Sequence, residues 1–158
     1  AIALGSMAIV CYIKLWLNYM IKKSKNKKIT QKTILVIEDE RPLVYAIQSK
    51  LEQNDFAVVT ARTVAQGLNY LEDIGNIDAI WLDHYLLGND NGLTLVAKLK
   101  DPKSKWNKIP IFVVSNTASS TNVKSYIRLG VSKYCVKAEH RLDGIVADIK
   151  SFLNKREK

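Results

Sequence analysis

Short apolar runs alternate with amphipathic segments along most of the chain, from residue 33 to about residue 154. Each apolar run is four to six residues long and ends at a polar residue, as a buried strand does. These runs predict strands at 33–37, 56–61, 78–82, 110–114 and 133–136. Between them, apolar residues recur at helical spacing, which predicts helices at 42–54, 64–75, 92–100, 120–129 and 141–154.

Five strand–helix units in regular alternation predict an α/β fold. Such units form a parallel sheet with helices on both faces, because the crossover between parallel strands is right-handed. The flavodoxin-like strand order 2-1-3-4-5 brings the ends of strands one, three, four and five around a single crevice. We therefore expect this order, with an additional apolar helix near the N-terminus, within residues 7–21.

Polar side chains follow four of the predicted strands at the point where each strand ends. Glu38 and Asp39 follow the first strand, Asp83 follows the third, Ser115 the fourth and Lys137 the fifth. Because the carboxyl ends of parallel strands share one edge of the sheet, we expect these five side chains to lie together.

The residue types at this edge indicate phosphoryl chemistry. Three carboxylates held close together repel one another unless a cation lies between them, and carboxylate oxygens suit Mg²⁺. An ammonium and a hydroxyl are the groups that bind the oxygens of a phosphoryl group. Asp83, as a nucleophile, would then form an aspartyl phosphate.

Net charge and cysteine content limit the binding partners and the cellular compartment that we expect for this protein. The net charge is +9, but residues 1–32 hold seven lysines and no acid, whereas residues 33–158 hold 17 basic and 15 acidic residues. The globular part is thus nearly neutral, which argues against direct nucleic-acid binding. Cys11 and Cys135 establish no disulfide framework, so we expect a reducing, cytoplasmic location.

Residues 1–31 form an apolar and basic leader that precedes the predicted domain at 32–156. The apolar run 7–21 is shorter than the roughly 20 residues of a membrane-spanning helix, and lysines follow it. Read as a helix, it calls for a partner: a membrane surface, a second copy in a homodimer, or a groove on the domain. Alternatively, the run Gly5-Ser6-Met7 is typical of a cloning junction, and the leader would then be vector-derived.

Residues 32–156 resemble the receiver domain of two-component response regulators, which is CheY-like. The resemblance lies in ILVIEDE (34–40), WLDHYLLG (81–88) with Gly92 beyond it, VVSNTAS (113–119) and KYCVKAE (133–139). It implies a phosphorelay protein that takes a phosphoryl group from a histidine kinase or a phosphotransfer domain. A downstream protein target would respond, and the domain would catalyse only its own phosphorylation and dephosphorylation, so it is not expected to be an enzyme otherwise.

The resemblance also implies roles for the residues at the active edge. Asp83 would be the phosphoacceptor, and Lys137 would bind the phosphoryl group. Asp39 and Asp83 would ligate Mg²⁺ directly, Glu38 through water, and Tyr85 through its backbone carbonyl. Glu38 stands where the family more often has aspartate.

A switch is implied by two further residues. Ser115 would move toward the phosphoryl group, and Tyr134, three residues before the lysine, would turn inward after it. Tyr85 and Thr117 would flank the path of an attacking water, so the bulk of Tyr85 is expected to slow loss of the phosphoryl group. Ala138 replaces the proline that normally follows the lysine.

Two other functions fit parts of this pattern. A degenerate receiver would act as an unphosphorylated protein-interaction module, although the full set of acids, serine and lysine argues against it. A phosphatase of the haloacid-dehalogenase type also uses an aspartate and Mg²⁺, but it places the nucleophile after its first strand in an Asp-x-Asp pattern. Here Asp83 follows the third strand and Tyr85 stands two residues on. Whether the chain is a stand-alone receiver or part of a larger protein stays open.

Overall fold

The computed structural model describes residues 31–86 and 91–156. Strands and helices alternate through this part of the chain, as the sequence predicts. The strands are β1 (Thr33–Ile37), β2 (Ala57–Ala61), β3 (Ala79–Leu82), β4 (Ile111–Ser115) and β5 (Lys133–Val136). The helices are α2 (Arg41–Glu52), α3 (Val64–Asp73), α4 (Gly92–Lys100), α5 (Ser120–Arg128) and α6 (Leu142–Lys155).

The five strands form one parallel sheet in the order β2-β1-β3-β4-β5. This confirms both the expected fold class and the expected strand order. In the register of the central strands, Ile37 pairs with Leu82 across β1 and β3, and Ser115 pairs with Val136 across β4 and β5. The residues that follow these pairs therefore emerge at the same edge of the sheet.

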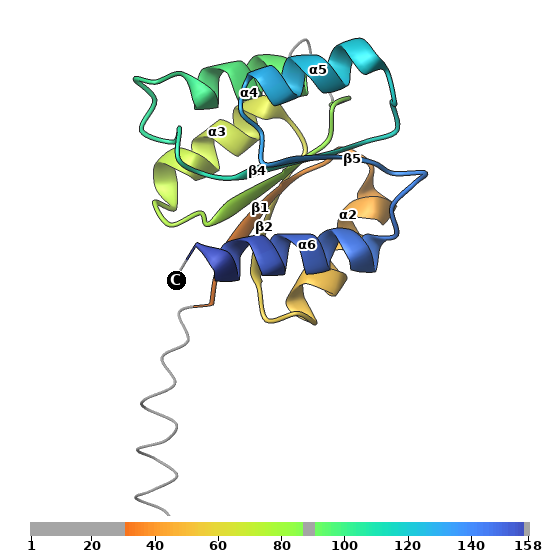
Figure 1. The fold of residues 1–158 in the computed structure, drawn as a ribbon. Helices are drawn as coiled ribbons and strands as arrows, with labels where there is room; N and C mark the ends of the chain where they lie inside the picture. The colour runs from red at the N-terminus through yellow and green to blue at the C-terminus, as the bar shows by residue number, and fades with distance from the viewer. Residues whose placement is uncertain (1–30, 87–90, 157–158) are drawn as a thin grey trace, which may run out of the picture. The chain divides into compact units, whose positions relative to one another are not determined.

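Helices cover both faces of the sheet (Figure 1). Helices α2 and α6 pack on one face, where Ile34, Val36 and Trp81 contribute to a buried cluster. Helices α3, α4 and α5 lie on the other face, over Leu35 and Ile37 among others. Alternate residues of β1 thus enter opposite cores, and burial on both faces explains why its sequence is continuously apolar.

Local signals set several element ends where the sequence places them. The side chain of Thr63 accepts a hydrogen bond from the backbone of Gln66 and caps α3, and Asn91 caps α4 in the same way. Gly130 follows α5 with a positive φ of 85°, a conformation that glycine adopts without strain.

Seven of the ten predicted elements differ from the observed ones by one or two residues at one or both ends, and Phe56 is an example. Phe56, expected in the second strand, lies in the turn before it, because its N–H donates to the carbonyl of Leu51 at 3.2 Å. The strand begins at Ala57, whose N–H donates to Lys32. The side chain of Phe56 is nevertheless buried, so its apolar character serves the core rather than strand pairing.

The expected leader and its apolar helix at 7–21 lie outside the described residues, and so do its proposed contacts with a membrane or a second copy. The domain boundary at residue 31 stays a prediction. Within residues 31–86 and 91–156, no helix combines the length and the apolar character that crossing a bilayer requires.

Candidate phosphoryl-transfer site

The ends of β1 and β3 build the centre of the site. The N–H of Asp83 donates to the carbonyl of Ile37 at 2.9 Å, which extends the pairing of the two strands by one residue. The N–H of Glu38 donates in the same way to Ala61 of β2 at 3.0 Å. Ladder hydrogen bonds therefore fix the backbone of both acids, and their side chains start from rigid positions.

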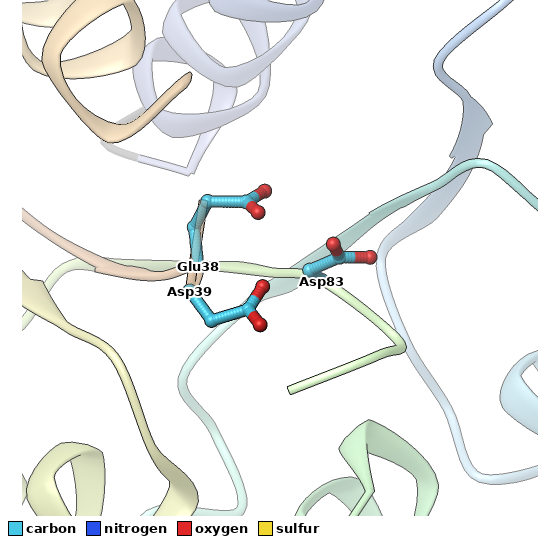
Figure 2. Close-up of side chains that lie close together, drawn as sticks. All are labelled: Glu38, Asp39 and Asp83. Atoms are coloured by element: carbon cyan, nitrogen blue, oxygen red, sulfur yellow. The ribbon is translucent and has the colours of Figure 1, made fainter. Parts of the chain in front are cut away.

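Three carboxylates meet at this edge. Glu38, Asp39 and Asp83 each offer an oxygen, and these oxygens lie within 4.8 Å of one another. Figure 2 shows the three carboxylates gathered in one place, two of them from the end of β1 and one from the end of β3. Glu38 and Asp83 are buried, whereas Asp39 is partly exposed. Hard oxygen donors gathered in this way fit a divalent cation such as Mg²⁺.

Lys137 adds a positive charge to the same place. Its Nζ donates hydrogen bonds to Glu38 at 2.8 Å and to Asp83 at 2.9 Å. Lys137 follows β5, and its own N–H donates to the carbonyl of Ser115 at 2.8 Å. The sheet thus brings together groups that are 99 and 54 residues apart in the chain.

Burial and charge act against each other in this cluster. Burial raises the pKa of Glu38 above its ordinary value, although the hydrogen bond from Lys137 offsets part of the effect. Burial alone would lower the pKa of Lys137, but its hydrogen bonds to Glu38 and Asp83 outweigh that cost and raise it. The lysine therefore stays charged at neutral pH.

The expected switch residues lie beside the acids. Ser115 is fully buried at the end of β4, and its hydroxyl accepts a hydrogen bond from the N–H of Thr117 at 3.3 Å. Tyr134 is half-buried, and its hydroxyl donates to the carbonyl of Thr117 at 2.8 Å. Among the described residues, no hydrogen bond joins the Ser115 hydroxyl to Asp83.

Tyr85 is exposed on the loop after β3, with 60% of its surface accessible. The proposed role of its carbonyl in binding a metal stays a prediction. The loop continues through residues 87–90, which lie outside the described part of the chain.

A buried polar contact near Asp83 was missed by sequence reasoning. The His84 ring Nδ1 lies 2.8 Å from the hydroxyl of Tyr126 on α5, and both side chains are buried. Burial lowers the pKa of the His84 ring, which favours its neutral form. In sequence, Tyr126 reads as one more apolar position of a helix, so no local signal links it to His84.

Gly92, the first residue of α4, fits tightly against the same contact. A Cβ at this position would lie 2.7 Å from the carbonyl oxygen of Asp83 and 2.7 Å from the hydroxyl of Tyr126. Its N–H donates to the carbonyl of His84 at 3.1 Å. Glycine here is therefore a packing requirement of the site.

Comparison with known proteins agrees with this geometry. The family model of the response regulator receiver domain matches residues 34–150, which is more than half of the chain. The chain belongs to this family, whose members are phosphoacceptor switches in two-component signalling and typically bind Mg²⁺ at an acidic pocket.

One curated relative and two solved structures illustrate the similarity. The chain is 31% identical over 107 residues to the alginate biosynthesis transcriptional regulatory protein AlgB of Pseudomonas putida; the match covers 68% of this chain but only 23% of AlgB. It is similar in structure to a CheY-like receiver domain protein from Methanospirillum hungatei, with a TM-score of 0.71, 22% identity, and coverage of 80% of this chain and 97% of that one. It is also similar to the phosphorylated cyanobacterial phytochrome response regulator RcpA, with a TM-score of 0.65, 25% identity, and coverage of 77% and 91%.

Proposed function

We propose that this domain accepts a phosphoryl group on Asp83 and passes the signal on by changing a protein-binding surface. The observation that carries the proposal is the position of Lys137, whose ammonium bonds to Asp83 and Glu38 at the edge where the three carboxylates meet. A structural ion pair would need one carboxylate; the excess of acids over bases suits a divalent cation, which together with Lys137 would bind the oxygens of a phosphoryl group.

In the proposed transfer, a carboxylate oxygen of Asp83 attacks the phosphorus of a phosphohistidine. The new P–O bond forms as the P–N bond breaks, and the histidine of the donor leaves with the bonding electron pair and takes up a proton. Lys137 already lies within hydrogen-bonding distance of Asp83, so it is placed to bind an oxygen of the transferred group. Burial of Asp83 limits competing access by water.

Glu38, Asp39 and Asp83 would hold Mg²⁺, since their oxygens have the right chemistry and converge in one place. Bound there, the ion would offset the negative charge that builds up on the phosphoryl oxygens. The carbonyl of Tyr85 is proposed as a further ligand, as the family resemblance implies.

The switch step would use Ser115 and Tyr134. The new phosphoryl dianion attracts hydroxyl donors, and Ser115 ends the strand between β3 and β5. If the Ser115 hydroxyl turns toward the phosphoryl group, it leaves the N–H of Thr117, and Tyr134 follows because its hydroxyl bonds to the carbonyl of Thr117. The surface formed by α5, β5 and α6 changes as a result.

The partners that this function requires are a histidine kinase or phosphotransfer domain upstream and a protein target downstream. The domain would not otherwise be an enzyme. A cytoplasmic location is proposed with it, in keeping with the free, buried thiol of Cys135.

Acetyl phosphate and Mg²⁺ provide the direct test. We expect the intact mass of the protein to rise by one phosphoryl group, and Asp83→Asn to show no increase. Asp101→Asn, which alters an exposed carboxylate on the loop after α4, should be phosphorylated like the wild type. Absence of any adduct in the wild type would favour an unphosphorylated interaction module, and steady turnover of a small phosphate ester would favour a phosphatase.

A further inference from the structure

His84 connects the proposed phosphoacceptor to helix α5. Its backbone N–H donates to Asp83 Oδ1 at 2.6 Å, and its ring Nδ1 lies 2.8 Å from the Tyr126 hydroxyl. The other ring nitrogen, Nε2, lies 3.3 Å from the side-chain nitrogen of Asn122, also on α5. One residue therefore touches the reacting carboxylate through its main chain and α5 through both nitrogens of its ring.

The contact is buried and tightly packed. Tyr126 is fully buried, and its ring packs edge-on against the His84 ring with centroids 5.7 Å apart. Gly92 packs against the same contact, because a single added Cβ would lie 2.7 Å from the Tyr126 hydroxyl. Since close-packed interiors change arrangement in steps rather than bending smoothly, a shift of His84 must be passed to Tyr126.

Tyr126 also contacts the expected switch residue. Its ring centroid lies 5.5 Å from that of Tyr134, whose hydroxyl bonds to Thr117. Tyr126 of α5 thus contacts both His84, which follows Asp83, and Tyr134, whose hydroxyl bonds to Thr117, two residues after Ser115.

Phosphorylation would change the first of these contacts directly. Asp83 Oδ1 now shares the carboxylate charge and accepts a charge-assisted hydrogen bond from His84. In an acyl phosphate the carboxyl group carries no net charge, whichever of its oxygens holds the phosphorus. The hydrogen bond from the His84 backbone therefore weakens when the phosphoryl group arrives.

We propose that His84 is a positioning residue that couples phosphorylation of Asp83 to the placement of α5 through its hydrogen bond to Tyr126. This inference rests on the proposed function. It gives α5 a second link to the phosphoryl group, in addition to the one through Ser115 and Tyr134.

Nuclear magnetic resonance of α5 amides tests the coupling. Spectra of the full chain are recorded with Mg²⁺, before and after addition of acetyl phosphate, and shifts are normalised to the phosphorylated fraction measured by mass. Tyr126→Phe keeps the ring and removes only the hydroxyl. We expect it to be phosphorylated as the wild type is, while the phosphorylation-dependent shifts of residues 120–128 shrink several-fold. Tyr70→Phe, which removes a half-buried hydroxyl on α3 that bonds to Gln66, should leave those shifts unchanged.

The double variant His84→Phe/Tyr126→Phe tests whether smaller shifts in Tyr126→Phe arise only because the fold is destabilised. It removes both polar partners and keeps two rings in contact, a change that is often nearly neutral for folding. The coupling predicts that its α5 shifts are no larger than those of Tyr126→Phe, because both variants lose the shared hydrogen bond and only the double variant also loses the contact between the His84 ring and Asn122. Full wild-type shifts in either phosphorylated variant would overturn the inference alone, whereas absence of an adduct in the wild type would overturn the proposed function with it.

Discussion

The ammonium of Lys137 lies 2.9 Å from Asp83 Oδ2 and also donates to Glu38 at 2.8 Å, so one cation holds two buried carboxylates. Two acids and one base leave an excess negative charge before Asp39 is counted. The site therefore gains from any further positive charge.

Removing the ammonium should cost stability. With the metal chelated, Lys137→Met should lower the free energy of unfolding by about 3 kcal/mol, because it leaves two buried carboxylates without a partner. Urea denaturation measures the loss. Lys133→Met is the control: its salt bridge to Asp148 is partly exposed, and its loss should cost less than about 1 kcal/mol. Equal losses in the two variants would contradict the role given to Lys137.

The affinity for Mg²⁺ should depend on the protonation of Glu38. A protonated carboxyl is a poor ligand, and burial raises the pKa of Glu38 above its usual 4.5 in the metal-free protein. As the pH falls, protons therefore displace the metal from a higher pH than an ordinary glutamate would allow. Calorimetric titration with Mg²⁺ at a series of pH values should show this decline. In Glu38→Gln the decline should begin at a lower pH; the same profile in both proteins would exclude Glu38 from the metal site.

Glycine at position 92 should be required for packing. Gly92→Ala places a methyl group 2.7 Å from both the Asp83 carbonyl oxygen and the Tyr126 hydroxyl, and should destabilise the protein by about 1–3 kcal/mol. Gly144→Ala is a matched control in α6, where the added methyl group meets nothing within 4 Å. It should raise stability by roughly 0.5–1 kcal/mol through its effect on the unfolded chain. Denaturation curves of the two variants should therefore move in opposite directions.

The bulk of Tyr85 should prolong the phosphorylated state. Its ring is exposed beside the site and packs edge-on against His84, with ring centroids 4.5 Å apart. In Tyr85→Ala an attacking water would reach the phosphoryl group more easily, so the adduct should decay faster. The decay is followed by intact mass after the donor is removed. Tyr45→Ala, which alters an exposed tyrosine on α2, should decay at the wild-type rate, and an unchanged rate in Tyr85→Ala would refute the shielding role.

Much of the fold could be predicted because its signals are local. The apolar run before Asp83 and the helical spacing after Gly92 each depend on a few neighbouring residues, and burial of the sheet on both faces explains the uninterrupted apolar strands. The predicted second strand started at Phe56, one residue before the observed strand. An apolar residue just before a strand has the same sequence pattern as the first residue of that strand.

The sequence by itself determined which groups end the strands, and therefore that acids, a hydroxyl and an amine meet at one edge. It did so because parallel strands align their ends, whatever the side chains do. Only the tertiary structure decided that Lys137 bonds to Glu38 as well as to Asp83, and that His84 reaches Tyr126 on a helix 42 residues away. Those contacts depend on how helices pack against the sheet, and the spacing of residues along the chain does not predict that packing.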